Sequence, residues 1–183
     1  MKTRRDFVRE ASLGAAGLAV GLNANSYARI LGANSRVNFA IIGLHGRGVA
    51  HLECIRQNEN AMVTHVGDVD RRDLDKFAAA VEKSFQQAPV KEKDFRKVLQ
   101  SKDVDVITIA TPEHWHTPIA LLGLQAGKHV YVEKPCSHNP REGELLVQAQ
   151  KKYGRLVQLG NQQRSSEHTI EIIGEIKKGV IGR

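Results

Sequence analysis

The chain alternates between short apolar runs and longer segments that repeat apolar residues at helical spacing. Runs rich in Val, Ile and Ala indicate buried strands, and the segments between them indicate amphipathic helices. The expected strands are Val37–Ile42, Ala61–Asp68, Val104–Ala110, His129–Val132 and Leu156–Leu159, with a short one near Val90. The expected helices are Val49–Gln57, Arg71–Phe85, Phe95–Gln100, Ile119–Ala126, Arg141–Tyr153 and Glu167–Lys178.

Strict alternation of strands and helices predicts an α/β fold with a doubly wound parallel sheet. In such a sheet, ligands bind beyond the carboxyl ends of the strands. Polar residues follow four of the expected strands, at Asp68, at Thr111 to His116, at Glu133-Lys134 and at Asn161 to Gln163. A hydrophobic core does not require polar residues at every strand end, so this pattern favours a ligand site there.

A glycine-rich turn follows the first expected strand, with glycines at Gly43, Gly46 and Gly48. A dinucleotide site needs a tight turn, close approach of the backbone to a pyrophosphate, and a helix N-terminus aimed at that anion. The spelling departs from G-x-G-x-x-G because His45 stands where the second glycine is expected, and an ordinary glycine-rich turn is the alternative. The strand-end residues favour the dinucleotide site. We expect the pyrophosphate on Gly46, Arg47 and Gly48, with His45 directed away from it or along the cofactor.

Asp68 is the candidate partner of the adenosine ribose hydroxyls. It follows Gly43 by 68 − 43 = 25 positions, close to the ~20 typical of this carboxylate. Asp70 is the runner-up, although it is better suited to cap the following helix. Arg71 and Arg72 could instead hold the 2′-phosphate of NADP, but Asp68 would repel that phosphate. The sequence therefore favours NAD over NADP.

Composition excludes several other classes of protein. The 183 residues suffice for about one domain, and 41% hydrophobic and 26% charged residues are typical of a soluble globular protein. The net charge is +7, but the basic residues are scattered among acidic ones and form no basic stripe, so no nucleic-acid partner is expected. His114 and His116 lack a third ligand at useful spacing, and Cys54 and Cys136 lie far apart, so no metal site is predicted.

The first residues have the layout of a secretory signal. Arg4 and Arg5 precede a small-residue apolar run, Ala11 to Leu22, and a small-x-small site follows at Ser26 to Ala28. The paired arginines resemble a twin-arginine signal; a cytosolic amphipathic helix is the alternative. The run is too short for a stable membrane span. We expect export to the periplasm or beyond by the twin-arginine machinery, with residues 1–35 as signal and linker and 36–183 as the folded domain.

Four motifs carry a family resemblance: A-T-P-E-H-W-H-T-P-I-A from Ala110, A-G-K-H-V-Y-V-E-K-P from Ala126, G-N-Q-Q-R from Gly160, and I-K-K-G-V-I-G from Ile176. They resemble the oxidoreductase family that includes glucose–fructose oxidoreductase and inositol dehydrogenase (Gfo/Idh/MocA). The resemblance runs from about Val37 to Arg183. It implies a Rossmann-like NAD(P)-binding domain here, and a second α/β domain for substrate and oligomer contacts that we expect to be missing from this chain. It also implies a homo-oligomer for a full-length form.

The resemblance assigns roles to the polar residues. Lys134 would be catalytic, because an ammonium beside a reacting carbinol stabilises the alkoxide and helps to move its proton. The other positions would bind cofactor: Gly43, His45, Gly46, Arg47, Gly48 and Asp68 at the pyrophosphate and adenosine ribose, Thr111, Pro112, Glu113, His114, Trp115 and His116 along its middle, and Glu133, Lys134, Asn161 and Gln163 near the nicotinamide. Trp115 would pack beside the cofactor or under the loop, with a place in the core as the alternative, and His116 would form a hydrogen bond near the cofactor or cap the helix.

The implied activity is NAD(P)-dependent hydride transfer between nicotinamide and a hydroxyl of a sugar, polyol or cyclitol. An NAD-dependent glycoside hydrolase of the same fold is the alternative, in which a transient oxidation permits elimination of the leaving group. The lysine of E-K-P favours the dehydrogenase. A third alternative is a truncated, non-catalytic nucleotide-binding fragment.

Overall fold

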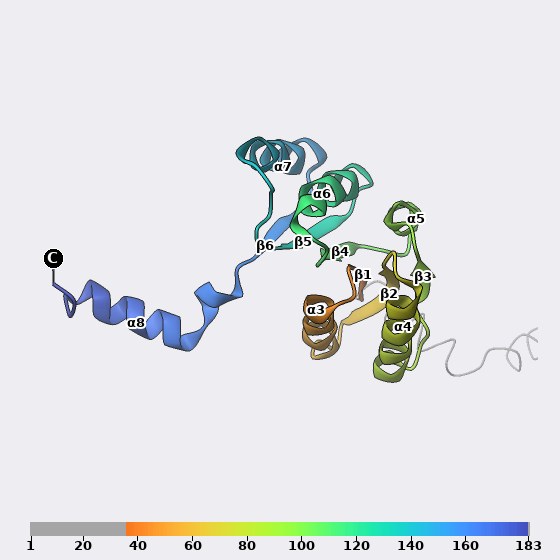
Figure 1. The fold of residues 1–183 in the computed structure, drawn as a ribbon, viewed down its shortest axis with the longest axis horizontal. Helices are drawn as coiled ribbons and strands as arrows, with labels where there is room; N and C mark the ends of the chain where they lie inside the picture. The colour runs from red at the N-terminus through yellow and green to blue at the C-terminus, as the bar shows by residue number, and fades with distance from the viewer. Residues whose placement is uncertain (1–35, 183) are drawn as a thin grey trace, which may run out of the picture. The chain divides into compact units, whose positions relative to one another are not determined.

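The computed structural model describes residues 36–182 and shows one sheet of six parallel strands (Figure 1). The strands are β1 Val37–Ile42, β2 Ala61–Gly67, β3 Val90–Glu92, β4 Val106–Ile109, β5 His129–Glu133 and β6 Val157–Gly160. Their order in the sheet is β3-β2-β1-β4-β5-β6. This arrangement confirms the predicted doubly wound α/β fold.

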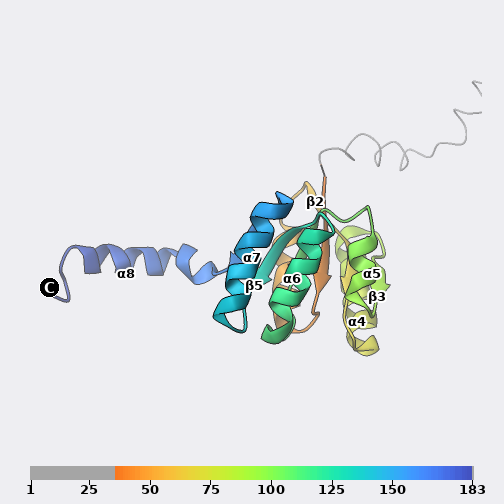
Figure 2. The ribbon, with the colours of Figure 1, turned by 90° about the horizontal axis from the view of Figure 1, so that it is seen from above.

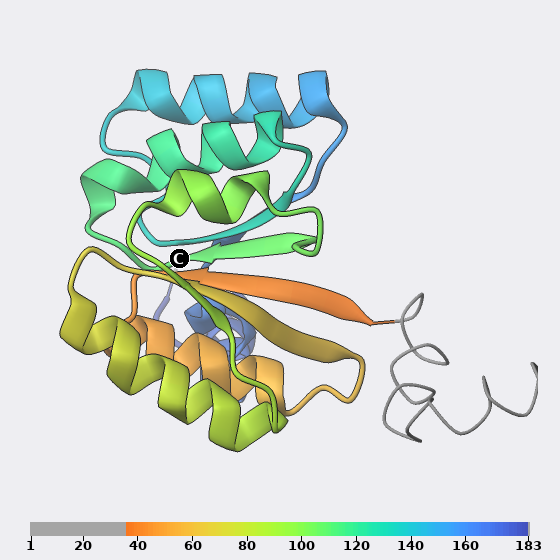
Figure 3. The same cartoon turned by 90° about the vertical axis from the view of Figure 1, so that its right-hand side faces the viewer.

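Helices cover both faces of the sheet (Figures 2 and 3). One face carries α3 Gly46–Arg56 and α4 Arg71–Phe85, and the other carries α5 Phe95–Gln100, α6 His116–Gln125 and α7 Pro140–Tyr153. The 3₁₀ turns η1 Glu113–Trp115 and η2 Gln162–Ser165 follow β4 and β6. The last helix, α8 Glu167–Lys177, has no buried residue.

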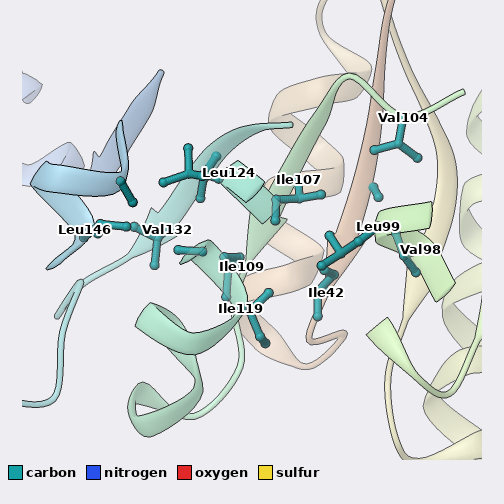
Figure 4. Packing of buried hydrophobic residues seen from close by; sticks show 14 residues of the cluster. Ile42, Val98, Leu99, Val104, Ile107, Ile109, Ile119, Leu124, Val132 and Leu146 are labelled. Carbon is teal, nitrogen blue, oxygen red and sulfur yellow. The ribbon is translucent and has the colours of Figure 1, made fainter. Parts of the chain in front are cut away.

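Alternate residues of β1 enter two separate hydrophobic clusters, as the two-residue period of a strand requires. Ala40 and Ile42 pack with α5, α6 and α7, whereas Ile41 packs with α3 and α4. Figure 4 shows the first cluster, in which Ile107 and Ile109 of β4 are fully buried. Burying one such side chain contributes about 1.5–3 kcal/mol, so both faces of the sheet stabilise the fold.

Most helices begin at a side-chain cap. The capping residues are Asp70 for α4, Asp94 for α5, Asn139 for α7 and Ser166 for α8. Each side chain accepts a hydrogen bond from a first-turn N–H, as is typical of N-caps. Asp70 is thus the helix cap that its sequence position suggested. The N-terminus of α3 has no side-chain cap.

Two helices begin three residues earlier than the apolar pattern predicts. Helix α3 begins at Gly46 rather than Val49, and α6 begins at His116 rather than Ile119. Their first turns contain glycine, arginine, histidine, threonine or proline, and such residues carry no apolar periodicity. Helix N-termini tolerate these residues because the first N–H groups need no partner within the helix.

The signal-like segment lies outside the described residues, so the twin-arginine signal stays a prediction. Within residues 36–182, no helix combines the length and the apolar character needed to cross a membrane.

Two glycines allow the backbone to close up at the end of β1. Gly43 has a φ of +89°, and a Cβ there would lie 2.5 Å from the Ala110 carbonyl carbon. A Cβ on Gly48 would collide with the Gly43 carbonyl oxygen. Gly46 differs, since a Cβ there would meet nothing within 4 Å.

We therefore expect Gly48→Ala to destabilise the fold by about 1–3 kcal/mol, because the added methyl group must displace backbone. Gly46→Ala is the matched control. It should leave the free energy of unfolding within about 1 kcal/mol of wild type, since alanine meets open space and favours the helix. Urea denaturation of both variants measures the difference. Equal stability of the two variants would contradict this account of the turn.

Candidate functional site

The candidate site lies where the direction of the sheet's connections changes. β1 lies between β2 and β4. The chain therefore leaves the ends of β1 and β4 toward opposite faces, and a crevice opens between the two turns. Backbone bonds hold these ends together: Gly43 N–H donates to Gly67 O at 2.9 Å, and Ala110 N–H donates to Ile42 O at 2.8 Å.

The turn after β1 leads into the uncapped N-terminus of α3. His45 is the residue before the helix, and its Nε2 lies 2.7 Å from Asp73 Oδ2 on α4. This contact holds the ring against α4 rather than over the end of α3. A helix N-terminus without a cap presents N–H groups to an anion. Together with the open space beside Gly46, this geometry fits a pyrophosphate.

Asp68, just beyond β2, is tied to the same turn. Its Oδ2 accepts a hydrogen bond from Leu44 N–H at 2.9 Å, and its Oδ1 accepts one from Asp70 N–H at 3.0 Å. Each carboxylate oxygen has a further lone pair, so both can still accept from a ribose hydroxyl.

The two arginines that could hold a 2′-phosphate already face acids. Arg72 Nη2 lies 2.7 Å from Asp70 Oδ2, and Arg71 Nε lies 3.9 Å from Asp75 Oδ2. This pairing agrees with the preference for NAD.

A cleft of about 240 Å³ opens beyond the ends of β4 and β5. It is lined by Arg47, Ala110, Thr111, His116, Glu133 and Lys134. Thr111 Oγ1 is buried and has no hydrogen-bond partner among residues 36–182. A buried hydroxyl without a partner is costly, so it is suited to a ligand that supplies one. The uncapped helix, the open glycine and this hydroxyl together fit a dinucleotide.

Lys134 is exposed at the cleft, and within the described part of the chain it makes no hydrogen bond or ion pair. The backbone that follows Lys134 is held by His116. His116 is buried at the start of α6, with Nδ1 2.6 Å from Pro135 O and Nε2 2.8 Å from Thr111 O. The ring caps no helix, so that alternative for His116 is wrong.

Glu133, the last residue of β5, points into a buried polar cluster under α3. Its Oε1 accepts from Arg47 Nε at 2.8 Å and lies 3.0 Å from His51 Nε2. Tyr131 packs edge-on against the His51 ring, with centroids 5.1 Å apart. Because Gly160 of β6 has no side chain, there is space for the Glu133 carboxylate; a Cβ at Gly160 would lie 3.0 Å from Glu133 Oε1. The carboxylate thus links α3 to β5.

Burial acts oppositely on the two partners. For His51, burial lowers the pKa more strongly than the hydrogen bond to Glu133 raises it. For Glu133, burial raises the pKa, but the hydrogen bonds from His51 and Arg47 outweigh it and hold the pKa below its ordinary value. A neutral histidine therefore donates to an ionised carboxylate.

Several predicted cofactor contacts do not line this cleft. Pro112, Glu113, His114 and Trp115 form an exposed turn, and Asn161 and Gln163 are exposed in the loop after β6. Trp115 is 46% exposed and packs edge-on against Phe95, with centroids 6.0 Å apart. The alternative that Trp115 belongs to the core is therefore wrong.

His51, Tyr131 and Gly160 were not predicted as site residues. One local signal was present for His51, because it follows Arg47 by one helical turn and so shares its face of α3. Its partner Glu133 is 82 residues away in sequence, and no local pattern connects them.

A larger hollow of about 410 Å³ lies at the opposite end of the sheet, beside Val37, Val106 and His129. Lys128 lines it, but the Lys128 ammonium is used by the fold: Nζ donates to Val104 O at 2.8 Å and to Ser101 O at 2.5 Å. Because ligands of open parallel sheets bind at the carboxyl ends, the smaller cleft is the candidate site.

Comparison with known proteins agrees with this geometry. The model of the Gfo/Idh/MocA oxidoreductase family, described as an NAD-binding Rossmann fold, matches residues 37–161. A glycosyl hydrolase family 109 protein from Saccharopolyspora erythraea is 32% identical over 94% of this chain and 41% of its own length. A protein of the same name from Shewanella sp. strain ANA-3 is 24% identical over 98% of this chain and 43% of its own length. The chain thus spans about two fifths of these relatives.

Solved structures share the fold. Apo scyllo-inositol dehydrogenase from Lactobacillus casei is 25% identical, with a TM-score of 0.70, over 81% of this chain and 43% of that protein. The WlbA dehydrogenase from Bordetella pertussis, solved with NADH and UDP-GlcNAcA, is 23% identical with a TM-score of 0.72, over 81% of this chain and 44% of its own. At that identity, the second similarity supports the fold alone.

The buried histidine predicts a pH dependence of stability. Because the folded-state pKa of His51 lies below its unfolded value of about 6.5, the unfolded chain binds more protons below that pH. Stability should therefore fall as the pH drops through about 6.5, by at most ~1.4 kcal/mol per pH unit for this one group. His51→Gln keeps a donor for Glu133 without titrating, so it should flatten the slope. His168→Gln, an exposed control, should keep the wild-type slope. Urea denaturation between pH 5 and 7.5 would contradict the assignment if His51→Gln followed wild type.

Proposed function

The chain belongs to the Gfo/Idh/MocA oxidoreductase family and contains its NAD-binding Rossmann domain; from this premise we propose that it is the cofactor-binding part of an enzyme that oxidises or reduces a hydroxyl-bearing carbon of a sugar, polyol or cyclitol. The observation that carries the proposal is the Lys134 ammonium at the cleft, which has no partner among residues 36–182, like the Thr111 hydroxyl that lines the same cleft. An ammonium that the described part of the fold does not pair is free to bind a reacting oxygen.

The nicotinamide, when bound, supplies the acceptor or donor of a hydride. The chain's own residues supply binding and proton transfer. The α3 N-terminus and Gly46 would accommodate the pyrophosphate, Asp68 would accept from the adenosine ribose, and Thr111 would contact the middle of the dinucleotide. In the direction of reduction, the Lys134 ammonium would hold the carbonyl oxygen, stabilise the negative charge that develops on it, and donate a proton to it. In the direction of oxidation, the same nitrogen, without that proton, would take the proton of the hydroxyl group.

NAD is the favoured cofactor. A 2′-phosphate would lie near the Asp68 carboxylate, and like charges repel. Arg72, which could compensate, is paired with Asp70. Calorimetric titration of the chain with NAD and with NADP compares the two cofactors.

A second candidate is an NAD-dependent glycoside hydrolase. It is favoured by the name of the 32% identical relative, a glycosyl hydrolase family 109 protein. In this chemistry a transient oxidation would acidify a neighbouring C–H bond and permit elimination of the leaving group; water would then add to the resulting double bond, and the hydride would return to the carbonyl carbon. A non-catalytic nucleotide-binding fragment is the third candidate.

Binding and catalysis should separate at Lys134. We expect this chain to bind NAD in calorimetry, and Lys134→Ala to keep that affinity, because the proposed role of the ammonium is on the reacting oxygen. In a longer form with a substrate domain, Lys134→Ala should lower kcat by about 10²–10⁴-fold, the usual contribution of an acid or base. Lys151→Ala, on the exposed side of α7, is the control. Absence of NAD binding at millimolar cofactor would refute the cofactor assignment, and turnover that survives in Lys134→Ala would refute the catalytic one.

The two enzyme classes differ in the fate of the hydride. A dehydrogenase should form NADH in proportion to the sugar consumed. A glycosidase should release an aglycone from an aryl glycoside without net NADH, and it should do so with catalytic NAD. Absorbance of NADH and of the aglycone, followed together in the longer form, decides between them. We expect net NADH.

A further inference from the structure

The residues on both sides of Lys134 in the chain are held by hydrogen bonds from other elements of the fold. On its N-terminal side, the Glu133 carboxylate is held from α3 by Arg47 and His51. On its C-terminal side, the Pro135 and Cys136 carbonyls are held from α6 by His116 and Thr117. The lysine side chain itself has no contact of this kind within residues 36–182.

His116 is placed to hold two chain segments at once. Its ring reaches Pro135 O through Nδ1 at 2.6 Å and Thr111 O through Nε2 at 2.8 Å. The ring is 3% exposed, so water does not compete for these contacts. Carbonyl oxygens only accept, so the ring nitrogen that carries a proton donates to the carbonyl it faces.

Thr117 adds a parallel contact. Its hydroxyl donates to Cys136 O at 2.9 Å, and the residue is fully buried. Two successive residues of α6 therefore hold two successive carbonyls after Lys134. The turn after β4 and the segment after β5, which border the cleft, become one unit through α6.

We propose that His116 is a positioning residue for Lys134: it fixes the backbone after β5 against the Thr111 carbonyl, so that the Lys134 ammonium stays beside bound dinucleotide. This inference rests on the proposed function of Lys134. It differs from the cofactor-contact role that the sequence suggested for His116, because both ring nitrogens lie within hydrogen-bond distance of the chain's own carbonyls. His116 acts through the backbone and not by touching the cofactor.

The test uses this chain and NAD, with acylation of Lys134 read by mass spectrometry. In wild type, bound NAD should slow acylation of Lys134. In His116→Gln, NAD affinity by calorimetry should be little changed, but this protection should fall by roughly tenfold, because the flexible glutamine side chain lacks the rigid ring that lies against both carbonyls. Thr117→Val, which removes one hydroxyl at similar volume, should lose part of the protection. His138→Gln is the control, because His138 is exposed and lies close to Lys134 in sequence; this variant should retain both NAD affinity and protection.

The outcomes separate the two proposals. If NAD binds wild type but does not protect Lys134, the proposed function fails, whatever the variants show. If wild type is protected and His116→Gln is equally protected, or loses NAD binding together with protection, His116 is not a positioning residue. If His116→Gln does not fold, as judged by circular dichroism, Thr117→Val decides: full protection in that variant overturns the inference.

Discussion

The close backbone contact at the end of β1 is the constraint on which the site depends. Gly43 lies so near Ala110 that a side chain would displace the turn after β4, and Gly48 lies against the Gly43 carbonyl. These contacts bring the N-terminus of α3 and Thr111 to one crevice. The irregular spelling of the glycine turn is consistent with this packing. Of the three glycines, Gly43 and Gly48 allow two backbone segments to approach closely, and only Gly46 borders open space among residues 36–182.

Glu133 couples the two sides of this crevice, α3 and the end of β5. A buried carboxylate is costly unless it is paired and fully hydrogen-bonded, and here Arg47 and His51 of one helix provide the partners. The strand that ends in Glu133 is therefore fixed to the helix whose N-terminus fits the pyrophosphate. Arg47 cannot be considered a cofactor ligand alone, because part of its guanidinium already neutralises Glu133.

Periodicity was sufficient to predict the sheet, because buried strands and amphipathic helices differ in the spacing of apolar residues. Periodicity did not predict the first turns of α3 and α6, because Gly46 and His116 carry no apolar signal. The strand-end rule located Lys134 and Thr111 correctly at one cleft. It could not find the His51–Glu133 contact, which joins residues 82 positions apart. Nor could it show that Trp115 lies on the surface, because burial depends on tertiary packing.

The two lysines at the ends of β5, Lys128 and Lys134, differ in how the fold uses them. Lys128 is buried, and its ammonium is consumed by the carbonyls of Ser101 and Val104. Burial lowers the pKa of Lys128, and the carbonyl contacts compensate for part of that cost. Lys134 is exposed, and its donors are unused within the described chain, while the residues on either side are tied down. A reactive group needs this combination, since a free ammonium on a loose backbone would not hold a reacting oxygen in one place.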